Sequence, residues 1–334
     1  MTPLGVHPQT RTLYDFLYWL MYRRKRADGI HPYNNAARRG GYYPPAFVEL
    51  NYYIVVKEVK MRILEWFEEY VFEMRAAVEA GIYEEKQAVL DEVDLKIAHT
   101  FEVSKHCVHI AKWLKMDDKD IRLAEIIGLT HDLGRFEQAV KFGTMDDRIT
   151  GNHGTMSAEI FKTKVPKAGL SEREIDIIEH ALRVHNAFVL PEADFETQRF
   201  SKLIRDADKL DIFRHYCSTH EAAELRKFRF ITSDVAGDYS KNMLDGVLSG
   251  QNLQVGDIKN ASDRHLMQIS LLYDMNFNCS LEIVLEENYM ARMTDVATNK
   301  ADAVMRKIYA YAMEWIEERL SGHDLTKSAH GCIM

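Results

Sequence analysis

The stretch EIIGLTHDLGRFEQ, residues 125–138, places an apolar run directly before a histidine and an aspartate. On a regular helix, the neighbours His131 and Asp132 would point about 100° apart. An apolar core has no place for either of them. In one interpretation the helix simply ends here, with Gly134 as its stop. In the other, both side chains turn toward a common point such as a metal ion.

Histidines gather around this stretch. Nine of the fourteen histidines lie between residues 99 and 220, and several aspartates accompany them. Nitrogen and oxygen ligands without thiolates suit Fe, Mn, Co, Ni or Zn, and carboxylates also suit Mg. Helical proteins build metal centres by pointing such ligands inward from several helices. The sequence therefore favours a metal centre over a simple helix end.

The pattern of the chain predicts an all-α protein. Its seven prolines leave the long spans 46–165 and 192–334 free of proline, which favours helices. No convincing run of alternating strands and no repeat is present. The expected helices cover about residues 10–23, 46–78, 83–114, 119–133, 153–163, 171–187, 197–230, 237–248, 262–274 and 296–321. Residues 26–45 and 142–152 are expected to be loops, and 232–262 to be irregular.

Three parts are expected along the chain: a helical extension at residues 1–82, a metal-binding core at 83–232, and a second helical extension at 233–334 packed on that core. The 334 residues are enough for one large or two ordinary domains, and 46% hydrophobic residues can bury a full core. The apolar faces of the two extensions make a homodimer conceivable, although each is expected to pack on its own core.

Charge and composition exclude several classes of function. The net charge of −8 argues against general nucleic-acid binding. No apolar stretch is long enough to span a membrane. The segment TLYDFLYWLMYRRKR, residues 12–26, carries its charges after the apolar part, unlike a signal peptide. The four cysteines form no CxxC, which suits a reducing compartment, so we expect a cytoplasmic protein.

The order of the histidines and aspartates resembles the HD domain superfamily of metal-dependent phosphohydrolases. Its pattern is a His, then a His-Asp pair, then a later Asp, and binuclear members add two histidines before the last Asp. The similar segments, over about residues 95–215, are KIAHTFEV, THDLGRFE, NHGTMSAEIF, ALRVHNAF and RDADKLDIF. The local sequence of these segments is similar to that of a bacterial branch of the family whose substrates are generally unassigned. The resemblance implies an all-α HD-domain fold with the ligands His99, His131, Asp132, His153, His185 and Asp208.

The resemblance also implies a mechanism. Two divalent ions need a negatively charged bridge, and Asp132 is the candidate. His99, His131 and Asp208 would complete one ion, and His153 and His185 would hold the second. Water activated by the ions would then attack a phosphoester or phosphoanhydride of a nucleotide or another small phosphorylated metabolite. The expected enzyme is thus a phosphatase or phosphodiesterase, with Asp132 and Arg135 as its catalytic residues.

Some assignments within the site stay open. His180 is an alternative to His185 as a ligand, and the centre would be mononuclear if His153 or His185 pointed away. His106 and Asp211 are candidates to orient the metal ligands through hydrogen bonds, without binding the ion themselves. Basic residues beside the motifs are candidates for phosphate contacts, since arginine offers a fork and lysine a point charge; these are Arg135, Lys141, Arg148 and Lys209.

Departures from relatives disfavour several substrates. Hydrolases of the stringent-response alarmone carry an acidic pair where Arg135 and Phe136 stand, and deoxynucleoside monophosphatases carry a Glu in place of Arg135. The GYP signature of cyclic-di-GMP phosphodiesterases is absent after His185, where NAFVLP stands. Two other functions are alternatives. One is a mixed-valent di-iron oxygenase of the same fold, because similar ligands serve that chemistry. The other is a non-catalytic module that only binds a ligand.

Overall fold

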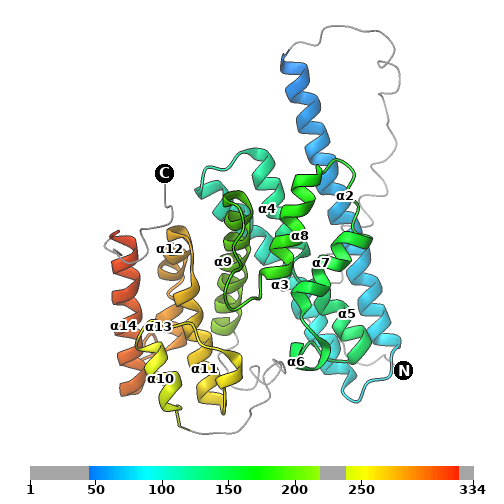
Figure 1. Ribbon diagram of the computed structural model, residues 1–334. Coiled ribbons are helices and arrows are strands. Elements are labelled where there is room, and N and C mark those ends of the chain that lie inside the picture. The colour runs from blue at the N-terminus through cyan, green and yellow to red at the C-terminus, as the bar shows by residue number, and fades with distance from the viewer. Residues whose placement is uncertain (1–44, 219–237, 323–334) are drawn as a thin grey trace, which may run out of the picture. The chain divides into compact units, whose positions relative to one another are not determined.

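The computed structural model describes residues 45–218 and 238–322, with side chains from residue 59 onward. Within these ranges the chain contains α-helices, two 3-10 helices and no strand, which confirms the predicted all-α class (Figure 1). The helix expected at 10–23 lies outside the described residues. So does the loop expected at 26–45, apart from Pro45, where the first described helix begins.

The helices before the second gap are α2 (Pro45–Ala80), α3 (Lys86–Trp113), α4 (Asp118–Thr130), α5 (Leu133–Phe142), α6 (Asp147–Thr150), α7 (His153–Lys164), α8 (Glu172–Val184) and α9 (Phe195–Ser218). After it come α10 (Lys241–Val247), η2 (Val255–Asp257), α11 (Ala261–Ser270), η3 (Leu271–Asp274), α12 (Asn278–Glu286), α13 (Tyr289–Met293) and α14 (Ala303–Leu320). The chain divides into two compact units, Met1–Asn51 and Tyr52–Met334, and the second holds every helix from α3 onward.

Aromatic side chains join α2 to the helices beside it. Phe67 of α2 makes edge contacts with Phe101 of α3 and Phe136 of α5, at ring-centroid distances of 5.6 and 6.3 Å. Both Phe67 and Phe136 are completely buried. Tyr70, one turn after Phe67, donates its hydroxyl to the carbonyl of Leu133 at 3.3 Å. These contacts fix α5 at the point where the chain leaves the His-Asp pair.

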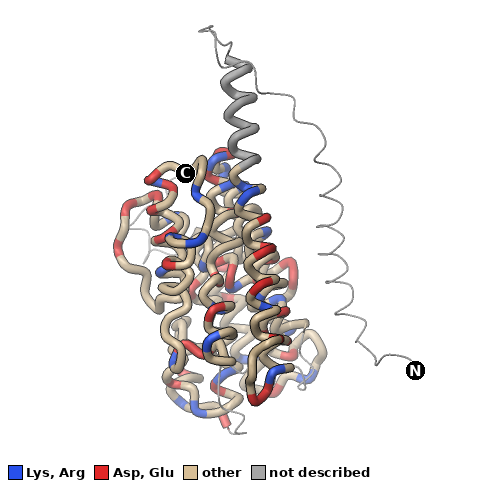
Figure 2. Tube along the Cα trace, turned by 90° about the vertical axis from the view of Figure 1, so that its right-hand side faces the viewer, with Lys and Arg blue, Asp and Glu red and all other residues tan. Residues whose placement is uncertain are grey.

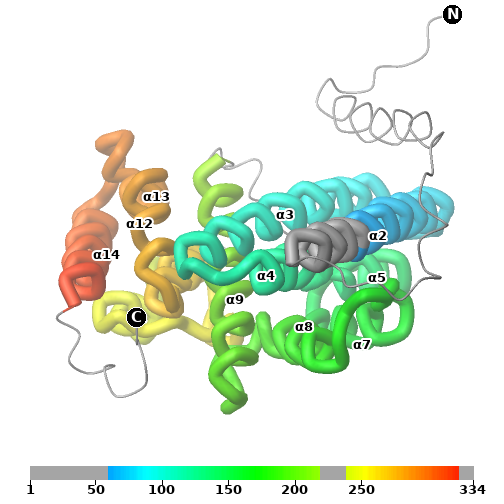
Figure 3. The backbone as a smooth tube through the Cα atoms, turned by 90° about the horizontal axis from the view of Figure 1, so that it is seen from above, coloured from blue at the N-terminus to red at the C-terminus, as the bar shows by residue number. Residues whose placement is uncertain are grey.

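Helix α9 lies between α10–α14 on one side and α3, α7 and α8 on the other, as Figures 1 and 3 show. Its buried Asp206 accepts hydrogen bonds from the backbone N–H groups of Asn276 and Phe277, at the start of α12. Arg205 and Lys209 both pair with Asp274 of η3. Arg205, Asp206 and Lys209 lie next to Asp208 on α9. Their contacts with η3 and the start of α12 therefore hold the part of α9 that carries Asp208.

Three boundaries differ from the sequence-based prediction. The helix expected at 119–133 breaks after Thr130, and Gly134 does not stop a helix but lies in the first turn of α5. The loop expected at 142–152 contains the short helix α6. The chain between 274 and 296 forms α12 and α13, which the sequence did not suggest; Asn288, with a φ of 54°, makes the turn between them.

Basic and acidic residues are interspersed along the described part of the chain in the view of Figure 2. Among the helices of the described ranges, none combines the length and the apolar character that crossing a membrane requires.

Candidate metal centre

The six predicted ligands converge in the interior of the second unit. They come from separate places: His99 from α3, His131 from the end of α4, Asp132 from the start of α5, His153 from the start of α7, His185 from the end of α8, and Asp208 from α9. They form two groups, here named the first trio (His99, His131, Asp208) and the second trio (Asp132, His153, His185). Within each trio the ligand atoms all lie within 4.8 Å of one another, as a metal site requires.

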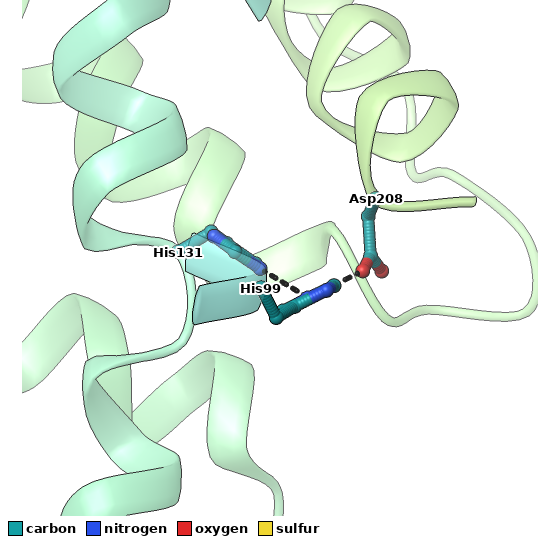
Figure 4. Close-up of side chains that lie close together, drawn as sticks. All are labelled: His99, His131 and Asp208. Carbon is teal, nitrogen blue, oxygen red and sulfur yellow. Dashed lines mark hydrogen bonds and ion pairs between the residues drawn. The ribbon is translucent and has the colours of Figure 1, made fainter. Parts of the chain in front are cut away.

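The first trio joins three helices (Figure 4). His99 Nε2 lies 3.3 Å from His131 Nε2 and 3.1 Å from Asp208 Oδ1. Both histidines are buried, while the Asp208 side chain is 21% exposed. Two imidazole nitrogens and one carboxylate oxygen thus face one another.

The second trio has the same composition. His153 Nε2 lies 3.0 Å from His185 Nε2, and the Oδ1 atom of Asp132 lies 3.4 and 3.8 Å from these two nitrogens. All three side chains are buried. Asn152 caps α7 by accepting a hydrogen bond from the N–H of Thr155, so His153 is not the cap and its ring is directed inward.

Asp132 stands between the two pairs of histidines. Its Oδ1 faces His153 and His185, as described above. Its other oxygen, Oδ2, lies 3.6 Å from His99 Nε2 and 3.4 Å from His131 Nε2. Each carboxylate oxygen therefore faces one pair of histidines, so this carboxylate could contact an ion at either pair.

Two of the histidines are fixed by the helix that they follow. The Nδ1 atom of His131 lies 2.8 Å from the carbonyl oxygen of Gly128, and that of His185 lies 2.7 Å from that of Leu182. The last carbonyls of a helix lack partners within it, and each ring supplies one by donating its Nδ1–H. Helices α4 and α8 thus end in a histidine whose Nε2 is left to face the centre.

The other two histidines are fixed by carboxylates. Asp211 of α9 lies 2.7 Å from Nδ1 of His99, and Asp147 of α6 lies 2.7 Å from Nδ1 of His153. A ligating histidine typically donates its second N–H in this way, which sets its tautomer and orientation. All four rings therefore turn Nε2 toward the centre.

Glycines bring α5, α7 and α8 close enough to form the second trio. A Cβ atom at Gly134 would lie 2.4 Å from the carbonyl oxygen of His153, and one at Gly154 would lie 2.9 Å from that of Leu182. Both distances are too short for any other residue without a shift of backbone. The start of α7 is therefore held between the His-Asp segment and the end of α8.

The carboxylates of the centre are ionised at neutral pH. Burial raises the pKa of Asp132, but the Lys96 ammonium and the His131 ring lower it more, and the net pKa lies well below its usual value. Burial likewise raises the pKa of Asp208, and the hydrogen bond and charge of His99 outweigh that effect. Both groups are thus available as anionic ligands.

The histidines differ in their protonation. Burial lowers the pKa of His185 to about 3, and burial is also the main cause of the lowered pKa of His153. Burial acts in the same direction on His99, but hydrogen bonds with Asp208 and Asp211 raise its pKa more, so the net pKa is raised. The rings of the second trio are therefore neutral at pH 7, as ligands must be.

Two cations approach Asp132, one at each oxygen. Lys96 Nζ lies 2.6 Å from Oδ2, and Arg135 Nε lies 3.9 Å from Oδ1. Arg135 also donates through Nη1 to Asp147 at 3.0 Å and to the carbonyl of Met145. The predicted phosphate contact Arg135 is thus beside the centre and tied to the segment that contains α6.

The remaining predicted residues lie in varied surroundings. Neither trio includes His180 or His106; His106 is near enough to Asp211 for its pKa to respond to that charge, although burial is the main cause of its lowered value. The other basic candidates pair with carboxylates of neither trio: Lys141 with Glu137, Arg148 with Asp146, and Lys209 with Asp274. Their role as phosphate contacts stays a prediction.

Two residues at the centre were not identified from the sequence. Asp147 lies six residues before His153 in an expected loop, and no motif marks it. Lys96 stands one turn before His99 on α3, in the quoted segment KIAHTFEV. Its spacing of three from a ligand places it on the same helix face, which is the signal that could have found it.

The donor set suits divalent ions of the borderline and hard classes, because four imidazole nitrogens and two carboxylates converge and no thiolate is among them. Such a set, carried inward by several helices, could hold divalent ions. The family model described as HD domain matches residues 97–212, about a third of the chain. Residues 97–212 are therefore similar to the HD domain, a family whose members bind divalent metals and are typically metal-dependent phosphohydrolases. No curated protein and no solved structure gave a significant match.

Proposed function

We propose that this protein is a binuclear metal-dependent phosphohydrolase acting on a nucleotide or another small phosphorylated metabolite. One observation carries the proposal: the two oxygens of Asp132 face different histidine pairs, His99 with His131 and His153 with His185. A single-ion site would not need a second buried trio on the far side of its aspartate. The HD domain at residues 97–212 supports the same reaction class.

The residues have distinct roles in this proposal. Asp132 would be shared between the two ions, and the other five ligands would complete their coordination. Divalent ions held there would supply Lewis acidity, which lowers the pKa of a bound water toward neutrality and offsets negative charge on a phosphate. Arg135, beside Oδ1 of Asp132, contacts the substrate phosphate with its planar fork. Burial of the ligands excludes bulk water, which strengthens each of these charge interactions.

The first test is hydrolysis of a panel of nucleotides and small phosphate esters by protein loaded with Mn²⁺, Co²⁺, Ni²⁺ or Mg²⁺. Asp132→Ala should lose at least about a hundredfold of any activity, because removal of an outer partner of a ligand already costs about 10–100-fold. Asp91→Ala, which removes a surface carboxylate of α3 hydrogen-bonded to Gln87, is the matched control. A fully loaded protein that hydrolyses nothing on the panel would contradict the proposal.

The same ligands would also serve a di-iron oxygenase, and the two chemistries separate in one experiment. Protein purified without added metal is analysed for iron, and oxygen uptake is followed with candidate substrates. Two irons per chain with substrate-dependent oxygen uptake would replace the hydrolase proposal. Binding of phosphorylated compounds without turnover of any kind would instead leave a ligand-binding module.

A further inference from the structure

Lys96 has an unusual position for a lysine. It lies on α3 one turn before His99, its side chain is 14% exposed, and its ammonium lies 2.6 Å from Oδ2 of Asp132. No role for this residue was predicted from the sequence.

The same oxygen faces the first trio, so Lys96 and an ion at that trio meet at one atom. Oδ2 of Asp132 lies within 3.6 Å of both His99 Nε2 and His131 Nε2. A divalent ion bound about 2 Å from Oδ2 would then stand less than about 5 Å from the ammonium. Two positive charges at that distance in a buried site repel each other, so lysine and ion compete for the carboxylate.

An anion between them removes the conflict. Asp132 has a cation at each oxygen, Lys96 at Oδ2 and Arg135 at Oδ1. Once ions occupy both oxygens, both cations face a centre whose positive charge has grown. A phosphate group that binds the ions also offers further oxygens to the two cations, and lysine suits this role because its compact charge sits on a flexible stem.

We propose that Lys96 is a substrate-contact residue, whose ammonium moves from Asp132 to a phosphate oxygen of the bound substrate on the side of the first trio. The proposal rests on the proposed function, and it extends that function by naming a second phosphate contact opposite Arg135. The ligand class is a phosphate that carries at least two negative charges, since two divalent ions and two side-chain cations surround it.

The test uses two binding measurements on the full chain, with Lys96→Met, which keeps the length of the stem and removes the charge. In Mn²⁺ titrations the variant should bind the ion at the first trio more tightly than wild type does, because the competing ammonium is gone. In Mn²⁺-loaded protein, inorganic phosphate should bind about tenfold more weakly or worse, as expected for loss of one hydrogen bond to a charged group. Lys96→Arg should recover much of the phosphate affinity.

Lys105→Met is the matched control, because Lys105 lies on the same helix and pairs with Glu102 at the surface; both affinities should equal those of wild type. If Lys96→Met binds Mn²⁺ more weakly and phosphate unchanged, Lys96 only supports Asp132 and the proposal is overturned. Absence of Mn²⁺-dependent phosphate binding in wild type overturns it as well. If phosphate binds as expected but no ester is hydrolysed, the hydrolase assignment fails while the role of Lys96 stands.

Discussion

The two trios have the same composition but different surroundings. At the first trio, the carboxylate that contacts Nδ1 of His99 belongs to Asp211 of α9, the long helix that also carries Asp208. The Asp211 side chain is 1% exposed. At the second trio, the carboxylate that contacts Nδ1 of His153 belongs to Asp147 of α6, a helix of four residues. The Asp147 side chain is 33% exposed. One orienting carboxylate thus belongs to the core and the other to a surface segment.

This difference predicts two ions of unequal affinity. Long packed helices open rarely, whereas short surface segments open at low cost in free energy. An imidazole fixed by a buried partner keeps its orientation, so the first trio should hold its ion more tightly. The second ion should be the exchangeable one, and its affinity should depend on the segment that contains α6.

The largest expected effect comes from removing one histidine of each trio. Elemental analysis of protein purified without chelating resin should give two ions per chain for wild type. His153→Ala should retain about one, because the first trio is complete. His99→Ala should retain less than one after gel filtration, since the weaker second trio remains alone.

Equal losses in the two variants would show that the trios do not differ. A single ion in wild type that His153→Ala leaves in place would reduce the centre to a mononuclear site made by the first trio and Asp132.

A smaller effect is expected from the two orienting carboxylates. Asp147→Asn should weaken the second ion about 10–100-fold, and Asp211→Asn should weaken the first by a similar factor, because each loses the charge behind a ligand. Asp211→Asn should also lower the free energy of unfolding by about 1–3 kcal/mol, since the group is buried. Asp147→Asn, partly exposed, should leave the melting temperature nearly unchanged.

Mn²⁺ titration and thermal unfolding of the same samples test this pair. A loss of the first ion in Asp147→Asn, or of the second in Asp211→Asn, would break the one-to-one assignment of carboxylate to trio.

The smallest effect concerns pH. The pKa of His99 is raised and those of His153 and His185 are lowered, so His99 is the first of the three to protonate as pH falls. An ion must displace that proton, and affinity of the first trio should therefore rise as pH rises above the ordinary histidine pKa of about 6.5. Mn²⁺ titrations of His153→Ala at several pH values measure this trio alone; a flat profile would contradict the assignment.

The sequence predicted the all-α class and the residues that converge, because ligand types and their order are properties of the chain itself. Asp147 and Lys96 escaped prediction for a tertiary reason. Lys96 of α3 meets Asp132 only once α3 has packed against the start of α5, and Asp147 meets His153 only once α6 has folded against the start of α7. The break between α4 and α5 was also missed, since the apolar pattern before it continues without a proline.

The close contact at Gly134 has a consequence for how such chains are recognised. A search pattern built from ligands alone would accept a chain with alanine two residues after the aspartate of the His-Asp pair. That chain would carry every ligand, yet its added methyl group would meet the carbonyl oxygen of the residue at position 153. A pattern that also requires glycine at this position would therefore select chains in which α7 can pack against the His-Asp segment as it does in this protein.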